Sequence, residues 1–184
     1  MISRRSATTL YIVTLAIFAA MTPVRWWLEG KIGMPYSMPD LILGLDAQTL
    51  AQFQSAMNMP LGDSTGGAWF LAIHTYSLDL ALPAVTALSF AVFLWRTGAQ
   101  LPSFNAMERR AKMLACIIIS VPGMMVDYME NYEVAKLLTH HDMPSAKTAS
   151  IISVLTTLKF SCLVLSLIVC GTFLLATLKH KKNL

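Results

Sequence analysis

Four long apolar stretches constrain the fold of this chain more than any other feature. A helix needs roughly 20 mostly apolar residues to cross the hydrocarbon core of a bilayer, and four segments meet this requirement, at about 9–28, 68–95, 113–138 and 151–178. Only 13% of the residues are charged, whereas soluble domains carry about 25%. The sequence therefore predicts an all-α polytopic membrane protein, an antiparallel four-helix transmembrane bundle that forms a single domain over residues 1–184.

The distribution of Lys and Arg predicts the orientation of the helices. Basic residues gather in the N-terminus, the second connection and the C-terminal tail. They are Arg4, Arg5, Arg96, Arg109, Arg110, Lys112, Lys179, Lys181 and Lys182. Because cytoplasmic loops are enriched in Lys and Arg, we expect a multi-pass protein of the bacterial cytoplasmic (inner) membrane with both termini in the cytoplasm. This topology also explains the net charge of +4, so that no nucleic-acid partner is expected.

The outer connection at 30–67 is expected to contain one short helix. Asp46 is a favourable N-cap for a helix that runs to about Met57, with Leu50, Phe53 and Met57 on one stripe. An amphipathic helix of this kind is expected to lie along the membrane surface, as an interfacial helix. It is either a lid over the bundle or a simple connection, and the sequence leaves both interpretations open.

Ionisable side chains inside the predicted spans are the main clue to function. Such groups are costly in the hydrocarbon region, and they usually face the interior of a bundle, where they mark a functional site or a structural pair. Asp127, Glu130 and Asn131 stand at i, i+3 and i+4 of one helix, which places them on one face. Asp79 and Lys159 lie within the second and fourth spans.

The depths of these residues can be compared across the predicted hairpins. In an antiparallel hairpin, two residues at equal height have numbers that sum to a constant, so Lys159 is expected opposite Glu130 and Asp79 opposite Met129. The cluster is then about 12 Å from the outer end of the third helix, in the outer half of the membrane. Tyr76 and Asn131 are expected to orient its groups by hydrogen bonds.

The charge of the predicted cluster is unbalanced. Three carboxylates meet one ammonium, and at least one carboxyl is expected to hold a proton near neutral pH because the ionised forms are disfavoured together in a low dielectric. The same depth comparison places Arg25 level with Leu71, at a rim above the cluster with His74 and Glu133. A carboxyl that exchanges a proton suits either proton-linked transport or acid/base chemistry.

A metal site or a cofactor is not expected from these residues. His74 precedes Asp79 by five residues, which is about 140° around an α-helix, so the two are not predicted to share a face. Lys159 in the middle of the cluster also opposes a bound cation. An alternative interpretation is that the Lys–Glu pair only locks the four helices in register, since buried ion pairs can specify an arrangement without adding much stability.

Three short motifs carry the cluster, and the outer loop adds a fourth feature. They are Asp79 with Pro83, Asp127-Tyr128-Met129-Glu130-Asn131, Lys159-Phe160, and the short helix opened by Gly44-Leu45-Asp46. In these motifs the chain resembles a family of small, largely uncharacterised bacterial four-helix integral membrane proteins with an intramembrane Asp-x-x-Glu-Asn motif. The resemblance implies the fold and the topology, and it implies no activity.

Three functions are compatible with these observations. The first is binding or translocation of a small solute or a proton, in which Asp127 or Glu130 exchanges the proton and Lys159 is its counter-ion. The second is a membrane-embedded enzyme that acts on a lipid or isoprenoid by carboxylate acid/base chemistry, which requires a cavity open sideways between helices. The third is a structural or assembly subunit of a membrane complex. A transporter of only four helices is expected to form a homodimer in the lipid bilayer.

Overall fold

The computed structural model of the chain describes residues 3–33, 42–140 and 143–182, and it confirms the predicted all-α four-helix bundle. The four spans are α1 (Arg4–Ile32), a composite helix over Gly66–Gly98, α6 (Arg109–Thr139) and α7 (Ala146–Lys182). Each is longer than the predicted segment by one to five residues at each end. This difference has a simple cause, because helical hydrogen bonding continues past the apolar stretch into the polar interface.

Two short helices and a hairpin complete the described residues. They are α2 (Ala47–Met57), α5 (Pro102–Asn105), β1 (Pro60–Leu61) and β2 (Ser64–Thr65). The two strands pair antiparallel, and Gly62 between them has a φ of 63°, a left-handed conformation that favours glycine in a tight turn.

The second span lies where the sequence predicts it, but its winding is not that of a regular α-helix. It consists of α3 (Gly66–Trp69), a π-helix η2 (Phe70–Leu78) and α4 (Asp79–Gly98). Pro83 follows shortly after the change from π to α winding. Its ring crowds the carbonyl of the residue four positions earlier and it donates no hydrogen bond, so the regular ladder is already interrupted at Asp79, where the wider winding ends.

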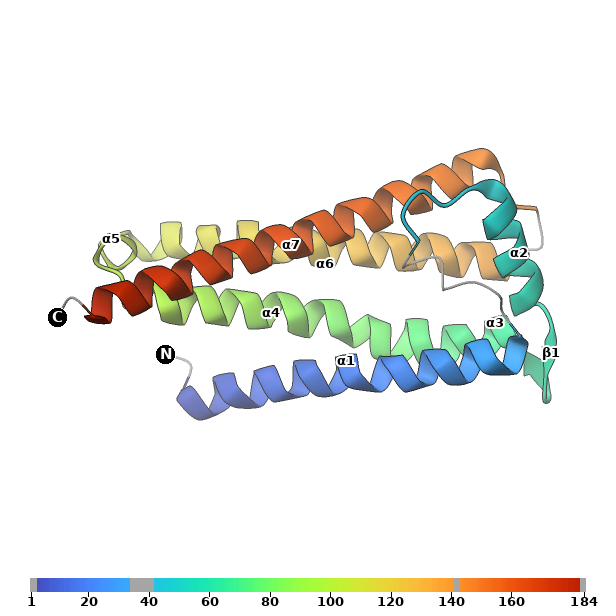
Figure 1. Cartoon of the computed structure of the whole chain (residues 1–184), viewed down its shortest axis with the longest axis horizontal. Coiled ribbons are helices and arrows are strands. Elements are labelled where there is room, and N and C mark those ends of the chain that lie inside the picture. Colours follow the sequence, from blue (N-terminus) through green and yellow to red (C-terminus); the bar gives the residue numbers. More distant parts are fainter. Residues whose placement is uncertain (1–2, 34–41, 141–142, 183–184) are drawn as a thin grey trace.

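Both termini of the described chain lie at one end of the bundle, and α2 lies at the other (Figure 1). We call these ends the terminal end and the α2 end. The composite span is central, since α4 packs against α1, α6 and α7, and α6 also packs against α7. Large apolar side chains such as Leu15 and Leu175 are exposed on the outside of the bundle, as a bilayer requires. The chain is therefore a multi-pass membrane protein.

The apolar stripe of α2 packs into the bundle. Leu50 and Met57 are fully buried, Phe53 is nearly so, and all three belong to a core cluster at the α2 end that includes Leu28 and Ile152. The predicted helix and its stripe are confirmed, and the structure adds that the stripe packs against the protein core at this end of the bundle.

A polar contact also holds α2 on the end of α6. The side-chain amide of Gln54 donates hydrogen bonds of 2.9 Å to the carbonyls of Leu137 and of His140. These carbonyls belong to the C-terminal turn of α6, where the helix itself provides no donor. Gln54 thus provides the hydrogen-bond donor that the C-terminal end of α6 lacks. In this position α2 covers its end of the bundle.

The N-cap of α2 predicts a pH dependence confined to the acid range. The Asp46 carboxylate accepts a hydrogen bond of 2.7 Å from the backbone N–H of Thr49, and this bond lowers the pKa of Asp46 below its ordinary value of 3.8. Because the pKa is lower in the folded protein, the stabilisation is complete above about pH 3.8 and is lost as the pH falls through the folded value. Hydrogen exchange of the first α2 amides should accelerate there, and Asp46→Asn should remove the dependence while keeping the cap.

A second core cluster fills the terminal end. It contains Leu94, Phe104, Cys116 and Cys170, with Phe173 packed against it. Between this cluster and the one at the α2 end, the four spans carry the ionisable residues. The fold thus places two apolar cores on either side of a polar middle region.

Candidate functional site

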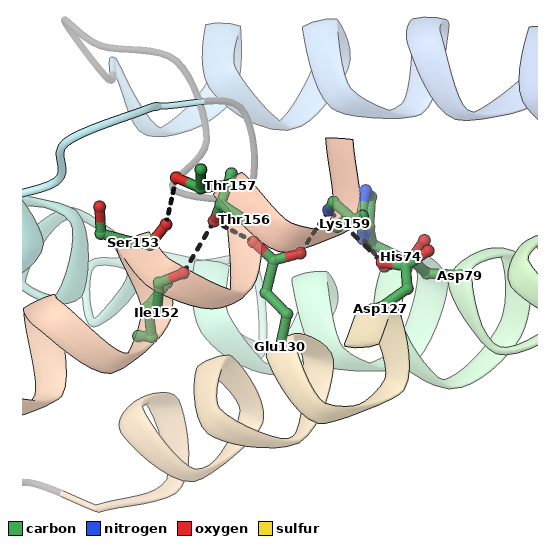
Figure 2. A network of polar contacts seen from close by, with 9 residues as sticks. All are labelled: His74, Asp79, Asp127, Glu130, Ile152, Ser153, Thr156, Thr157 and Lys159. Carbon is green, nitrogen blue, oxygen red and sulfur yellow. Dashed lines mark hydrogen bonds and ion pairs between the residues drawn. The ribbon is translucent and has the colours of Figure 1, made fainter. Parts of the chain in front are cut away.

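An ion-pair cluster joins α6 to α7 in the polar middle region. The Nζ atom of Lys159 contacts Oε2 of Glu130 and lies 3.4 Å from Oδ1 of Asp127 (Figure 2). Asp127 and Glu130 are one helical turn apart on α6, which allows a single ammonium on the facing helix to reach both carboxylates. The contact between Lys159 and Glu130 is the one that the depth comparison expects.

Glu130 is the most enclosed member of the cluster. Its side chain has no exposed surface, and the hydroxyl of Thr156 donates a hydrogen bond to Oε1 while Lys159 contacts Oε2. Thr156 lies one turn before Lys159 on α7, so the two side chains reach the same carboxylate from one face of that helix. Sequence reasoning did not assign this role to Thr156. Its position three residues before Lys159 is the signal that indicates it.

The π-helix brings His74 to Asp79. A π-helix closes hydrogen bonds between residues five apart, and the N–H of Asp79 accordingly donates to the carbonyl of His74. Residues 74 and 79 therefore stand one turn apart, and Nδ1 of His74 lies 3.7 Å from Oδ2 of Asp79. The prediction that these residues do not share a face is wrong, because it assumed the 3.6-residue turn of an α-helix.

The imidazole of His74 is buried and stacked against a neighbouring ring. Only 1% of the residue is exposed, and its ring stacks on that of Phe70 with centroids 4.6 Å apart. His74 is thus buried beside Asp79. The prediction that it lies at a rim above the cluster is wrong.

A cavity of about 520 Å³ lies beside the cluster, between α1, α4, α6 and α7. Asp79, Asp127 and Lys159 line the part of it that is nearer the α2 end. Glu130 is absent from its wall, so the structure divides the carboxylates into one enclosed group and two that face the cavity.

Helix α1 supplies further charged groups to the same cavity. Arg25 and Glu29, one turn apart on α1, both line it. The depth comparison placed Arg25 well above the cluster, and the structure instead has Arg25 at the wall of the cavity that Asp79 and Asp127 line. Glu29 was not predicted. Its spacing of four residues from Arg25 was the available signal.

The remainder of the cavity is mostly apolar and runs toward the terminal end. Its walls there come from every span and include Phe18, Leu82, Phe90, Met124 and Leu163. On α1 the cavity extends from Phe18 to Glu29, which corresponds to about 16 Å of helix. Only small polar groups, such as the hydroxyls of Ser120 and Ser166, interrupt this part of the wall.

The cavity reaches the lateral surface of the bundle. Two of its lining residues, Phe18 and Trp26, are 64% and 69% exposed on α1, and Leu163 on α7 is 36% exposed. α1 packs mainly against α4 and η2, while α7 packs against α6 and α4. The mouth therefore lies between α1 and α7, on a surface that faces lipid in a membrane.

The remaining predicted site residues lie elsewhere. Tyr76 is 58% exposed, and together with Asn131 it lines a second cavity of about 410 Å³ between η2 and α6. Both residues therefore line a different cavity from Asp79 and Asp127, and within the described residues neither has a hydrogen bond to the cluster that it is predicted to orient. The π winding turns Tyr76 away from the Asp79 face. Glu133 is half-buried on α6 and is absent from the walls of both cavities.

Comparison of the chain with protein-family models, with curated proteins and with solved structures finds no match.

Proposed function

We propose that this membrane protein binds a small amphiphilic molecule that enters the cavity sideways from the bilayer. The observation that carries this proposal is the cavity itself, which has charged groups at one end, an apolar wall along the rest and a mouth among lipid-exposed side chains. Ligand sites in proteins typically have volumes of about 300–1,000 Å³, with mostly apolar walls and a few convergent polar groups. The polar head of the ligand would lie near Asp79, Asp127 and Lys159.

The dimensions of the cavity suit a single apolar chain. About 16 Å of wall corresponds to roughly 13 methylene groups, at about 1.2 Å per bond of an extended chain. Burial of such a chain between protein side chains offers little hydrophobic gain over lipid tails, so selectivity has to come from the polar head. The charged end of the cavity therefore determines which molecule is retained.

The orientation of the bundle is part of this proposal. The terminal end carries nine of the basic residues of the chain, more than the α2 end, and we place it in the cytoplasm of a bacterial cell. The charged end of the cavity then lies in the outer half of the cytoplasmic membrane, below α2. Transport of a solute or proton would need a second opening, toward the terminal end, that forms in another conformation.

A second candidate function is a membrane enzyme that acts on a lipid or isoprenoid. The sideways opening favours it, since a lipid substrate has to enter from the bilayer. Asp127 would serve as the acid or base, because it lines the cavity and its carboxylate lies 3.4 Å from Lys159, while the apolar wall would hold the chain of the substrate.

Photolabelling with a single-chain amphiphile tests the binding function. Protein in nanodiscs would receive probes that carry a diazirine in the alkyl chain, and labelled residues would be mapped by mass spectrometry. We expect labels on cavity-lining residues, and we expect Leu163→Trp, which narrows the mouth, to reduce them several-fold. Leu165→Trp is the matched control, because Leu165 lies on the lipid side of the same helix, 54% exposed. Labelling that is the same in both variants, or spread evenly over the lipid-facing surface, would contradict the proposal.

A further inference from the structure

Building on the proposed binding function, we infer that the head of the ligand is a cation, such as a protonated amine or a quaternary ammonium. This inference concerns the charged end of the lateral cavity, where Asp79, Asp127 and Trp26 line the wall. It rests on the balance of charges around that end, on the position of the bases and on the aromatic side chains.

Acidic groups outnumber basic groups at this end of the cavity. Among the described residues, the charged side chains on its wall are three acids and two bases: Glu29, Asp79, Asp127, Arg25 and Lys159. Glu130 adds a fourth carboxylate directly behind Lys159. The sum is −2 when all are ionised. In surroundings with little water an excess of negative charge is unfavourable, so a cationic head would be favoured over a neutral or anionic one.

The two bases do not turn the site into one for anions. The ammonium of Lys159 is contacted by Glu130 and lies 3.4 Å from Asp127, so two carboxylates already share its single charge. Arg25 has Glu29 one turn away on the wall of the same cavity. An anionic head that approached either base would also approach these carboxylates, and the repulsion would cancel the attraction.

His74 does not reverse the balance. It is the titratable group closest to Asp79 from η2, at 3.7 Å, and its protonation would raise the sum only from −2 to −1. Among the described residues on the cavity wall, the other charged groups near Asp79 and Asp127 are those already counted, from α1 and α7. The charged end of the cavity thus keeps a negative excess when either the imidazole or one of the four carboxyls holds a proton.

Aromatic rings at the same end also favour a cation. Trp26 and Phe160 line the cavity beside the charged groups, and Lys159 already places its ammonium 5.5 Å from the centroid of the Phe160 ring. The face of an aromatic ring attracts a cation within about 6 Å of its centroid, and Trp does so most strongly. Trp26 is available for this contact at the mouth of the cavity.

Trp26 also provides the signal for a direct test. The probes are three single-chain amphiphiles with the same brominated alkyl chain and a trimethylammonium, hydroxyl or carboxylate head, added to protein in nanodiscs of zwitterionic lipid. Bromine near Trp26 quenches its fluorescence, and Trp26→Phe measures the background from the other tryptophans. We expect saturable quenching with all three probes. The affinity should be at least about tenfold higher for the trimethylammonium probe than for the hydroxyl probe, and lowest for the carboxylate probe.

Removal of single carboxylates completes the test. Two substitutions on different helices, Asp79→Asn and Asp127→Asn, remove one carboxylate each. Each is expected to lower the affinity for the trimethylammonium probe by about tenfold and the affinity for the hydroxyl probe much less. Asp63→Asn is the matched control, because it removes one negative charge in the hairpin at the α2 end, outside the cavity. If the hydroxyl or carboxylate probe binds as tightly as the trimethylammonium probe, the inference of a cationic head is wrong while the binding function stands. If no probe quenches Trp26, the binding function itself fails.

Discussion

Replacement of Lys159 by methionine is expected to lower the free energy of unfolding by about 3–5 kcal/mol. The reason is the environment of Glu130, which has no exposed surface and whose carboxylate contacts Lys159 and Thr156. Without the ammonium, that carboxylate stays buried without its counter-charge or has to take up a proton. Unfolding in detergent mixtures, followed by far-ultraviolet circular dichroism, measures the loss. Lys147→Met is the matched control, because Lys147 is exposed near the start of the same helix.

The double variant Glu130→Gln with Lys159→Met identifies the cause of that loss. Removal of both charges is expected to recover most of the stability, with a coupling energy of about 2–3 kcal/mol, because no buried charge is left behind. Such a result assigns the Lys159–Glu130 pair to holding α6 and α7 in register. If the single changes are neutral or stabilising, the native charges are instead kept at a cost to stability, as in a working site.

The polar cluster has two parts that differ in their surroundings. Glu130 and Thr156 fix the position of Lys159 from inside the protein, while Asp127 and Asp79 line the cavity. The sequence could not show this division, because Asp127 and Glu130 lie on one face of a single helix. The separation follows from the place where α1 and α7 leave space between them, and such a space depends on how whole helices pack.

The features that the sequence predicted well follow from chain geometry. The four spans follow from the length of apolar segments, and the height of Lys159 relative to Glu130 follows from counting along two antiparallel helices joined by a short turn. A regular helix advances 1.5 Å per residue, so such counting remains accurate over a few turns. It says nothing of the direction in which a side chain points, and for that reason Tyr76 and Asn131 were assigned to the wrong side.

The features that it missed depend on local departures from regularity. The spacing of five residues from His74 to Asp79 shows whether the two share a helix face only when the winding of the helix is known. The stretch Phe70–Leu78 mixes apolar residues with His74, Thr75, Tyr76 and Ser77, and no periodic pattern in it distinguishes a π-helix from an α-helix. Pro83 was the one local signal, and it indicates an interrupted helix without specifying the form of the interruption. Likewise, the stripe on α2 showed that this helix packs on something apolar, and both lipid and protein satisfy that condition.

The second large effect is expected from His74→Ala, which should lower the free energy of unfolding by about 3 kcal/mol. The imidazole is 1% exposed and stacks on Phe70, so its removal leaves a cavity in the core of the composite span. It also removes the group that lies 3.7 Å from Asp79. The same unfolding measurement applies, with Tyr76→Ala as control. Tyr76 is two residues away and 58% exposed, and its loss should cost within about 0.5 kcal/mol.

The variant His74→Phe separates the two contributions of the imidazole. A phenyl ring keeps the stacking on Phe70 and fills most of the same space, but it offers no nitrogen to Asp79. We expect it to restore part of the stability and to leave a deficit of about 1 kcal/mol, as for a lost polar contact. A full recovery would show that packing alone stabilises this turn. The π winding would then be a consequence of Pro83 and of the Phe70 contact, and the closeness of His74 to Asp79 would result from that winding without contributing to it.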